Sequence, residues 1–388
     1  MTVQIINAKI ILPYGGMPGV CRFTDGIIDY IGTEPQAADE TIDAQGAYLL
    51  AGFIDIHCHG GGGYDFMDAS PDEMREIARF HLSHGTTTLI PTTMTDRTEH
   101  IRAALDRLKT LYASGDALTL TGCHLEGPWL SPAQCGAQDT SKMQLPSKQA
   151  LDDLLADYPF ISRISAAPEL PWGMELGDYA KSRGLVVALA HTDADFDTAV
   201  EAADHGYTLM THLYSGMKSV VRVNAYRVAG AVEAGLVDDR LIAEIIADGK
   251  HLPAGLLKLI YRCKDADGIC LITDAMRGAG LANGQQTMLG RMDDGVPCLI
   301  DDDVAKLPDC TAFAGSTATT DRLVRTMHDL AGISLTRISR MASATPARVM
   351  GMDDRGSIEL GKRADLVLMD EDLRVQTVVL NGQLVNGY

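Results

Sequence analysis

Two histidines stand one residue apart at the end of an apolar run. The stretch GFIDIHCHGGGGYD, residues 52–65, carries His57 and His59 and then continues into glycines. Alternate residues of a strand share one face, so a strand here directs both imidazoles the same way and turns Cys58 to the other side. Two imidazole nitrogens on one face can bind one metal ion. The stretch therefore predicts part of a metal site.

Residues of similar chemistry end other apolar stretches further along the chain. Glu126 follows ALTLTGCHL, His191 ends GLVVALAH, His212 ends YTLMTH, Asp274 ends GICLITD, and His251 comes just after LIAEIIAD. In a barrel of parallel strands the carboxyl ends open on one face, where function concentrates. Nitrogen and carboxylate donors without thiolate suit zinc, iron, manganese, cobalt or nickel. The pattern indicates a metal site assembled from several strand ends.

Asp274 has two interpretations. Aspartate is a favoured helix N-cap, which gives a structural role at the start of the next segment. At the mouth of a barrel and facing a metal, it instead suits a general base that takes a proton from activated water. We favour the general base. His124 precedes Glu126 by two residues, and we interpret it as a packed or supporting histidine.

Eight apolar stretches alternate with amphipathic segments through the middle of the chain. Uniformly apolar, β-branched runs are typical of a parallel sheet buried on both faces. Eight such units predict a (β/α)8 TIM-like barrel over residues 51–354, with a polar hairpin insertion at 281–312. A doubly wound sheet is the alternative, but no glycine-rich phosphate fingerprint follows the first stretch. Strands are expected at 52–57, 86–92, 117–126, 161–169, 184–191, 207–212, 241–248 and 268–274.

Both chain ends carry patterns typical of short strands. VQIINAKIIL and GVCRFTDGIIDYIG lie near the start, and GKRADLVLMD and VQTVVLNGQLV near the finish, where Asn381-Gly382 indicates a hairpin turn. Each end alone has too few strands to be stable. We expect one small β-sandwich domain built from residues 1–50 plus 355–388, with the barrel inserted between them.

The overall composition excludes several kinds of partner. Among 388 residues, 52 are acidic and 33 basic, giving a formal charge of −19. This argues against nucleic acid and against an anionic membrane surface. No run approaches the roughly 18 apolar residues of a membrane span. The eight cysteines are scattered without a CxxC pair, which indicates a reducing compartment and a cytoplasmic protein.

Taken in order, the motifs are similar to those of a known family. AGFIDIHCHGGGG, HLEGP, THLYSGM, ADGKH, TDA, TPARVMG and GSIELGKRADLVLMD resemble the N-acetylglucosamine-6-phosphate deacetylase family of the amidohydrolase superfamily. The resemblance runs from about residue 45 to the end. It implies hydrolysis of the acetamide of N-acetylglucosamine 6-phosphate to glucosamine 6-phosphate and acetate. It also implies a barrel with a β-sandwich, and a homodimer in which the arm after the sixth strand approaches the partner's site.

The resemblance also assigns roles to positions. It implies two divalent ions, zinc or iron first, with manganese, cobalt or nickel as alternatives. His57 and His59 match a pair that holds the second metal in binuclear members. The ligands of the shared metal correspond to Glu126, His191 and His212, the catalytic aspartate to Asp274, and the substrate-contacting histidine to His251.

The substrate-binding positions depart from the family's usual sequence. Where the family commonly has THLYNAM, this chain has THLYSGM, so Ser215 and Gly216 replace an Asn-Ala pair near the phosphate. The arginine that follows has no clean counterpart; Lys218, Arg222 and Arg227 are candidates, with Arg222 nearest in spacing. The exact sugar stays open, and N-acetylgalactosamine 6-phosphate is an alternative. The remaining expected contacts are Ala137, Gln138, Phe313, Ala314 and Gly315.

Three other classes of protein fit less well. Cyclic-amide hydrolases such as dihydroorotase commonly bridge two metals with a carboxylated lysine on the fourth strand, whereas ISRISAAPE contains no lysine. A Ser-His-Asp hydrolase lacks its GxSxG elbow here. A non-catalytic relative typically loses ligands or the catalytic acid, and this chain keeps all of them.

Overall fold

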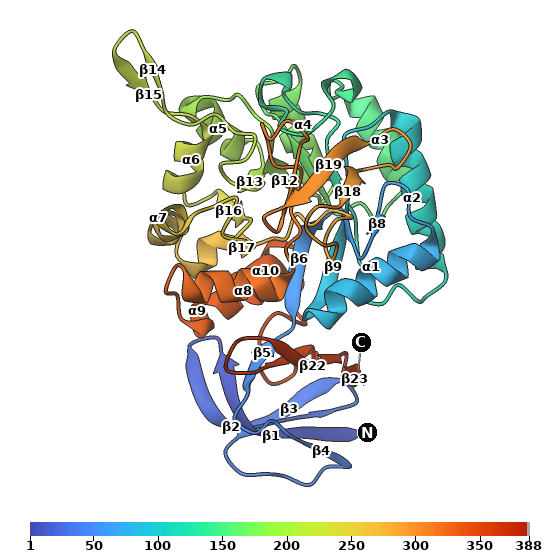
Figure 1. The fold of residues 1–388 in the computed structure, drawn as a ribbon, viewed down its shortest axis with the longest axis vertical. Helices are drawn as coiled ribbons and strands as arrows, with labels where there is room; N and C mark the ends of the chain where they lie inside the picture. The colour runs from blue at the N-terminus through green and yellow to red at the C-terminus, as the bar shows by residue number, and fades with distance from the viewer. Residues whose placement is uncertain (386–388) are drawn as a thin grey trace.

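The apolar stretches form the strands of a parallel barrel in the computed structural model, which describes residues 1–385 (Figure 1). Neighbouring strands follow chain order. The first and last strands close the ring, because Cys58 forms a parallel bridge with Ala275 and the Asp274 amide donates to the carbonyl of His57 at 2.9 Å. The predicted (β/α)8 barrel is confirmed. Its strands are β6 (Phe53–Cys58), β9 (Thr86–Thr93), β10 (His124–Glu126), β11 (Arg163–Ala166), β12 (Val186–Leu189), β13 (Tyr207–Met210), β16 (Ile242–Ile245) and β17 (Ile269–Leu271).

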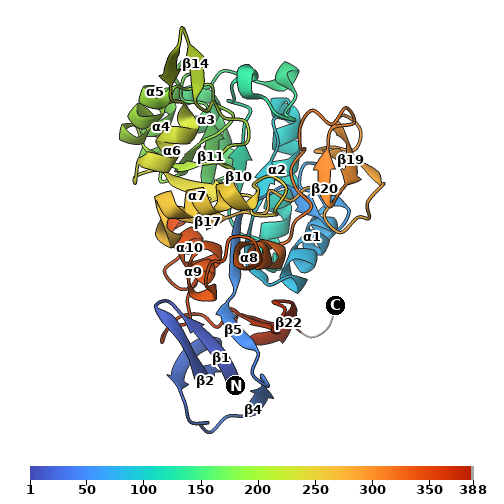
Figure 2. The same cartoon turned by 60° about the vertical axis from the view of Figure 1, so that its left-hand side comes forward.

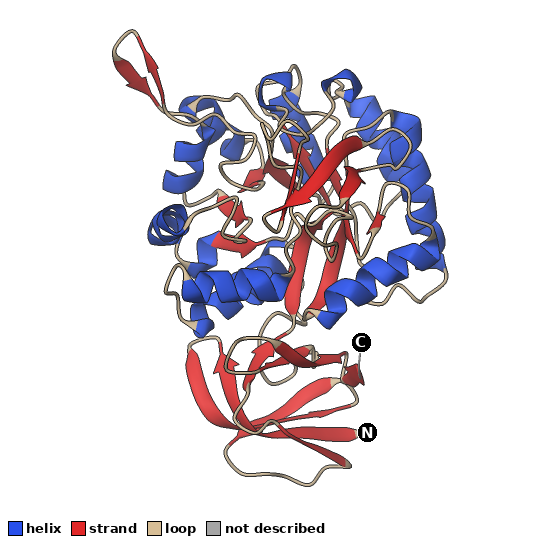
Figure 3. Cartoon of the chain, in the orientation of Figure 1, coloured by secondary structure: helices blue, strands red, loops and turns tan. Residues whose placement is uncertain are grey.

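Helices cover the outside of the barrel (Figure 3). Ser70 and Glu73 form a capping box at the start of α1, whose Met74 and Ile77 are completely buried against the strands. In the described residues, no helix combines the length and apolar character that a membrane span needs. The helices are α1 (Pro71–Ser83), α2 (Thr98–Ala113), α3 (Lys148–Asp157), α4 (Gly173–Ser182), α5 (Phe196–Asp204), α6 (Ala231–Val237), α7 (Ala254–Lys264), α8 (Thr320–Asp329), α9 (Leu335–Ser339) and α10 (Thr345–Val349), with a π-helical turn, η4 (Arg340–Ala344), between the last two.

The third barrel strand is shorter than its apolar stretch predicts. Strand geometry covers His124–Glu126, whereas the expected range was 117–126. Leu118 and Gly122 adopt positive φ angles of 53° and 61°, which extended strands exclude. A Cβ at Gly122 would lie 2.4 Å from the Ser162 hydroxyl. Close backbone packing, rather than hydrophobicity, therefore sets where this strand begins.

Within the described residues, the two chain ends build one eight-stranded sheet, which lies below the barrel in Figures 1 and 2. The ends join where β5 pairs with β1 on one side and with β21 on the other. Asn381 and Gly382, both with positive φ, form the predicted two-residue turn. The domain bounds 1–50 plus 355–388 stay a prediction, and residues 386–388 lie outside the described residues. The strands are β1 (Thr2–Leu12), β2 (Gly15–Thr24), β3 (Ile27–Gly32), β4 (Glu40–Asp43), β5 (Tyr48–Ala51), β21 (Leu366–Met369), β22 (Val375–Leu380) and β23 (Gln383–Val385).

Three small antiparallel sheets lie in loops of the barrel domain. The insertion expected at 281–312 forms a three-stranded antiparallel sheet of β18 (Gln286–Leu289), β19 (Val296–Asp301) and β20 (Val304–Lys306). The hairpin of β14 (Val221–Val223) and β15 (Tyr226–Val228) projects away from the barrel (Figure 1). A smaller pair, β7 (Gly60–Gly61) and β8 (Tyr64–Asp65), follows the first barrel strand.

Candidate metal centre and active site

His57 and His59 point together from the end of β6. Their Nε2 atoms lie 3.2 Å apart, and both side chains are buried. Cys58 turns away, with its Sγ 3.3 Å from Nε2 of His81. The alternation expected of a strand therefore separates the imidazole pair from the thiol.

The glycines after His59 allow the backbone to fold back on itself. A Cβ at Gly60 would lie 2.1 Å from the carbonyl oxygen of Tyr64, and one at Gly61 would lie 2.7 Å from Nε2 of His81. Neither position has room for a side chain. Gly60 and Gly61 thus let this loop pack tightly against Tyr64 and His81.

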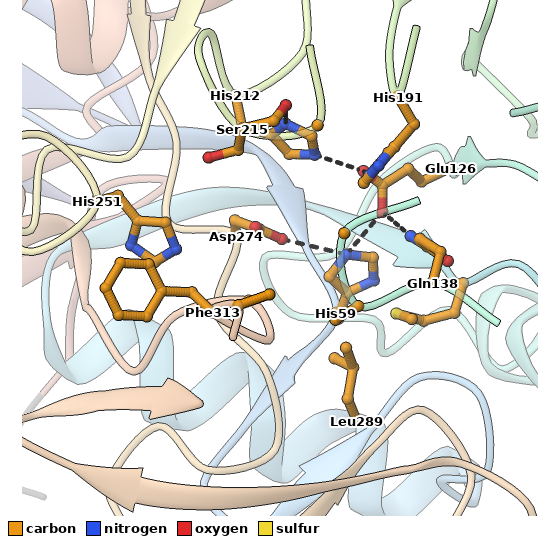
Figure 4. Close-up of a pocket in the computed structure, with 16 residues that line it drawn as sticks. His59, Glu126, Gln138, His191, His212, Ser215, His251, Asp274, Leu289 and Phe313 are labelled. Carbon is orange, nitrogen blue, oxygen red and sulfur yellow. Dashed lines mark hydrogen bonds and ion pairs between the residues drawn. The ribbon is translucent and has the colours of Figure 1, made fainter. Parts of the chain in front are cut away.

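Glu126 lies at the centre of the site, at the end of β10 (Figure 4). Its Oε1 is 2.8 Å from Nε2 of His212 and 3.4 Å from Nε2 of His191. Its Oε2 is 3.2 Å from Nε2 of His59. One buried carboxylate therefore faces two separate groups of histidines.

The donor atoms of each group lie close enough to hold a metal ion. Glu126 with His57 and His59 forms one group, and Glu126 with His191 and His212 forms the other; within each, the donor atoms all lie within 4.8 Å of one another. Imidazole nitrogens and a carboxylate are donors that suit zinc, iron and related divalent ions. The donor set fits two ions that share one carboxylate.

Backbone carbonyls orient the second pair of histidines. Nδ1 of His191 donates to the Gln134 carbonyl at 2.8 Å, and Nδ1 of His212 donates to the Ser215 carbonyl at 3.2 Å. Each contact leaves Nε2 free to face Glu126. Both histidines, and also Asp274, have positive φ angles of 42°, 33° and 47°. Such conformations are uncommon outside glycine and cluster at functional sites.

Asp274 faces the same centre from the end of the last barrel strand. Its Oδ1 lies 3.2 Å from Nε2 of His59 and 3.4 Å from Nε2 of His57. The next α-helix, α8, is capped by Thr319, so Asp274 is not the cap of that helix. Its position suits proton transfer beside the metal ligands.

The buried charges of the site influence one another. Burial lowers the pKa of His57, but the carboxylates of Glu126 and Asp274 outweigh it and raise that pKa to about 9. The same carboxylates raise the pKa of His59 against its own burial. Burial raises the pKa of Glu126, yet the surrounding imidazoles hold it well below its usual value. The carboxylates thus favour a cation here, either protons on the imidazoles or a metal ion in their place.

A pocket of about 670 Å³ opens above these groups. The structure also brings four residues into its wall that the sequence did not single out: Met94, Gly136, Leu289 and Ala312. Leu289 comes from the inserted sheet, and Met94 follows β9. The predicted residues that line the pocket are His59, Glu126, Ala137, Gln138, His191, His212, Ser215, Gly216, His251, Asp274, Phe313 and Gly315.

Gln138 contacts the metal ligand Glu126 as well as the pocket. Its Nε2 donates to Oε2 of Glu126 at 2.9 Å, while its Oε1 accepts the Thr95 amide at 3.1 Å. The backbone contact fixes which end of the amide faces the carboxylate. Gln138 therefore orients Glu126, a role that the sequence did not indicate.

His251 forms another wall of the pocket. Its Nδ1 lies 2.9 Å from Oδ2 of Asp248, and its ring centre is 4.6 Å from that of Phe313 (Figure 4). The contact with Asp248 leaves Nε2 for a ligand. The side chain of Phe313 is 39% exposed, so it offers an apolar ring face to a bound molecule.

Three predicted contacts lie outside the lining of this pocket. Arg222 and Arg227 face each other across the exposed hairpin of β14 and β15. Ala314 is buried behind its neighbours, and its amide donates to the carbonyl of Ala305 at 3.0 Å. The expected arginine contacts are therefore not made within this one chain.

Comparisons with known proteins agree with this geometry. A family model described as "Amidohydrolase family" matches residues 48–385. N-acetylgalactosamine-6-phosphate deacetylase of Escherichia coli O157:H7 is 34% identical over 371 residues, 94% of each chain. N-acetylglucosamine-6-phosphate deacetylase of Homo sapiens is 33% identical over 91% of this chain and 87% of its own. The crystal structure of N-acetylglucosamine-6-phosphate deacetylase from Pasteurella multocida superposes with a TM-score of 0.91, at 28% identity and with full coverage of both chains.

Proposed function

The chain belongs to the amidohydrolase family, and we propose that it hydrolyses the acetamide of N-acetylglucosamine 6-phosphate, giving glucosamine 6-phosphate and acetate. The observation that carries this proposal is the position of Glu126 between two histidine pairs, with Asp274 facing the same pocket. The named activity of several relatives supports the choice of substrate.

We assign His57, His59 and Glu126 to one divalent ion, and Glu126, His191 and His212 to a second. Zinc or iron is our first choice, with manganese, cobalt or nickel as alternatives. Bound there, the ions supply a Lewis acid that polarises the acetamide carbonyl and makes water a stronger nucleophile at neutral pH.

Asp274 transfers a proton during hydrolysis. Its carboxylate accepts a proton from the attacking water as the carbon–oxygen bond forms. It then passes that proton to the departing nitrogen, because an amine cannot leave as a bare amide anion. In the metal-free protein, burial raises the pKa of Asp274 but the neighbouring imidazoles outweigh it and lower that pKa, so the side chain is an ionised carboxylate.

His251 and the pocket walls position the substrate. Nε2 of His251 is left free to contact the acetamide oxygen as charge develops on it, since Asp248 holds the other ring nitrogen. Phe313 offers its ring face to the sugar. The backbone around Ser215 and Gly216 is assigned to the phosphate end of the pocket.

We propose that a second copy of the chain completes the binding site for the phosphate of the substrate. Arg222 and Arg227 are carried on a projecting hairpin, together with the exposed side chains of Val223 and Tyr226, 49% and 78% accessible. A basic arm with exposed apolar residues is suited to cover a neighbouring subunit and reach its anionic ligand. In this arrangement the protein is a homodimer, and each active site receives an arginine from the partner subunit.

N-acetylgalactosamine 6-phosphate is the second candidate substrate. The relative of that name is 34% identical over 94% of this chain, and the chain departs from the usual glucosamine sequence at Ser215 and Gly216. The two sugars differ at one hydroxyl, which leaves the metal centre and the acetamide chemistry the same.

Acetate release decides between these substrates. Protein of measured metal content is assayed with both N-acetylated 6-phosphates and with their unphosphorylated forms. We expect the highest kcat/KM with N-acetylglucosamine 6-phosphate and a large loss without phosphate. A clear preference for N-acetylgalactosamine 6-phosphate would make that sugar the assigned substrate. The absence of acetate release from any phosphorylated amino sugar would overturn the proposal.

A further inference from the structure

A buried carboxylate lies behind the metal ligand His57. Nδ1 of His57 is 3.6 Å from Oε2 of Glu244, on β16. The other carboxylate oxygen, Oε1, is 2.7 Å from Nη1 of Arg163, on β11. That nitrogen donates its hydrogen bond to the carbonyl of Ile56 at 3.0 Å, so its contact with Oε1 is an ion pair without hydrogen-bond geometry. The side chains of His57, Glu244 and Arg163 are completely buried. They form a row of ionisable groups inside the barrel that ends at His57.

Such a pair is unusual inside a barrel. Bulky branched apolar residues dominate the interiors of these barrels. A buried ion pair is weak evidence for stability, because well-packed apolar residues of similar volume often stabilise as much or more. We therefore infer that the ion pair of Arg163 and Glu244 has a role other than stabilising the fold.

The four ligand histidines differ in what holds their second nitrogen. His191 donates from Nδ1 to the backbone carbonyl of Gln134, and His212 to that of Ser215. Nδ1 of His59 has no hydrogen-bond partner within residues 1–385. Among these four, His57 is the one whose Nδ1 faces a carboxylate.

Two unpaired atoms face each other at this point. Within the described residues, Nδ1 of His57 and Oε2 of Glu244 are both buried without a hydrogen-bond partner. An imidazole that binds a metal through Nε2 carries its proton on Nδ1. A small rotation of either side chain brings that proton to the carboxylate. Outer partners of this kind fix the ring and increase the basicity of the ligand nitrogen.

We propose that Glu244 is a positioning residue for the metal ion held by His57 and His59. It accepts the Nδ1 proton of His57 and fixes that ring with Nε2 towards the ion, while Arg163 holds the carboxylate in place. The ion bound by Glu126, His191 and His212 does not depend on this contact. The inference rests on the two-ion site of the proposed function, but its test needs no substrate.

Titration of the metal-free protein with Zn²⁺ against a chromophoric chelator tests the proposal. The wild-type chain is expected to bind two ions. In Glu244→Gln, one site weakens by about 10- to 100-fold, the range for loss of an outer-shell partner, while the other keeps its affinity. Asp321→Asn is the matched control, because Asp321 is also buried and ion-paired, with Arg325, but lies outside the metal groups. It should leave both affinities unchanged.

A double variant separates positioning from stability. Arg163→Met/Glu244→Leu removes both charges and leaves no buried ion without its partner, so it tests the idea even if Glu244→Gln fails to fold. We expect the same selective loss of one ion in the double variant, with thermal unfolding of the metal-free protein close to wild type. Normal affinity at both sites in either variant would overturn the proposal. A wild-type chain that binds one ion would overturn it too. Acetate release, measured separately, reports on the proposed function alone.

Discussion

Oδ1 of Asp274 lies 3.2 Å from Nε2 of His59, although 215 positions separate the two residues in the chain numbering. Ring closure produces this contact, because the last barrel strand, β17, ends beside the first, β6. The proposed proton acceptor, from late in the barrel sequence, thereby meets a proposed metal ligand from its start. In the proposed function, acid–base chemistry and metal binding therefore share one pocket.

Replacing Asp274 by Asn tests the proton transfer. The amide keeps the shape of the side chain but cannot accept and return a proton. We expect kcat to fall by about 10²- to 10⁴-fold, the usual contribution of general acid–base catalysis, while both ions stay bound. Acetate release and metal content are measured on the same preparation. Wild-type turnover in this variant would show that another group moves the proton.

Glu126→Gln tests the shared carboxylate. The substitution removes the negative charge that faces both histidine groups, so we expect both ions to be lost on dialysis and activity to disappear. Gln138→Leu serves as the graded comparison, because it leaves the carboxylate in place and removes the donor to Oε2 of Glu126, together with the acceptor of the Thr95 amide. It should weaken metal binding by about 10- to 100-fold. Retention of two ions by Glu126→Gln would contradict the shared-ligand assignment.

Metal affinity should depend on pH through His57. In the metal-free protein the pKa of His57 is raised to about 9, so at neutral pH a metal must displace its proton. Affinity for the ion held by His57 and His59 is therefore expected to increase with pH towards about 9, by up to about tenfold per unit for each released proton, because the pKa of His59 is raised as well. Dissociation constants measured from pH 6 to 10 check this. A flat profile would contradict it.

The same group gives the metal-free protein a pH-dependent stability. Because the folded pKa lies above the unfolded value, the contribution of His57 is fully present below about pH 6.5 and is lost as the pH rises through about 9. Thermal unfolding of the metal-free chain should follow that direction over this window. His57→Gln is the control and should remove this part of the change.

Mixing two differently impaired variants tests whether the partner subunit supplies an arginine to each site. Arg222→Gln should raise KM for the phosphorylated substrate by about 10- to 100-fold, the value of a charge-assisted hydrogen bond, with little change in kcat. In a mixed dimer with Asp274→Asn, one site receives an intact Asp274 and its partner's intact arginine. Activity at low substrate should then recover after exchange of subunits. The same mixture made with Arg227→Gln shows which arginine matters, and no recovery with either would place the arginines elsewhere.

The sequence predicted the centre of the site because parallel barrels direct the carboxyl ends of their strands to one face. His191, His212 and Asp274 could be placed together for that reason alone, before any contact was known. The start of the third strand could not, since Leu118 and Gly122 have positive φ angles that end the extended backbone, and a Cβ at Gly122 would meet Ser162. Hydrophobicity carries no sign of them.

The residues that line the pocket, and those that contact the proposed metal ligands from behind, were harder to predict. Met94 and Leu289 are apolar residues that resemble core positions in a sequence, and only their place beside the pocket distinguishes them. Glu244 did carry a signal, because it is a charge inside an otherwise apolar strand, whereas Arg163 stands at the first position of its strand. In the proposed homodimer the surroundings of the hairpin arginines depend on a second copy of the chain, which no single sequence displays.

Metal reconstitution tests the central claim most directly. The chain is stripped of metal, returned stepwise to one and two equivalents of zinc or iron, and assayed for acetate release from N-acetylglucosamine 6-phosphate. We predict no turnover in the stripped protein and a rise to full activity as the ions bind. Full activity of the stripped protein, or no acetate from any phosphorylated amino sugar after two ions are bound, would contradict the account.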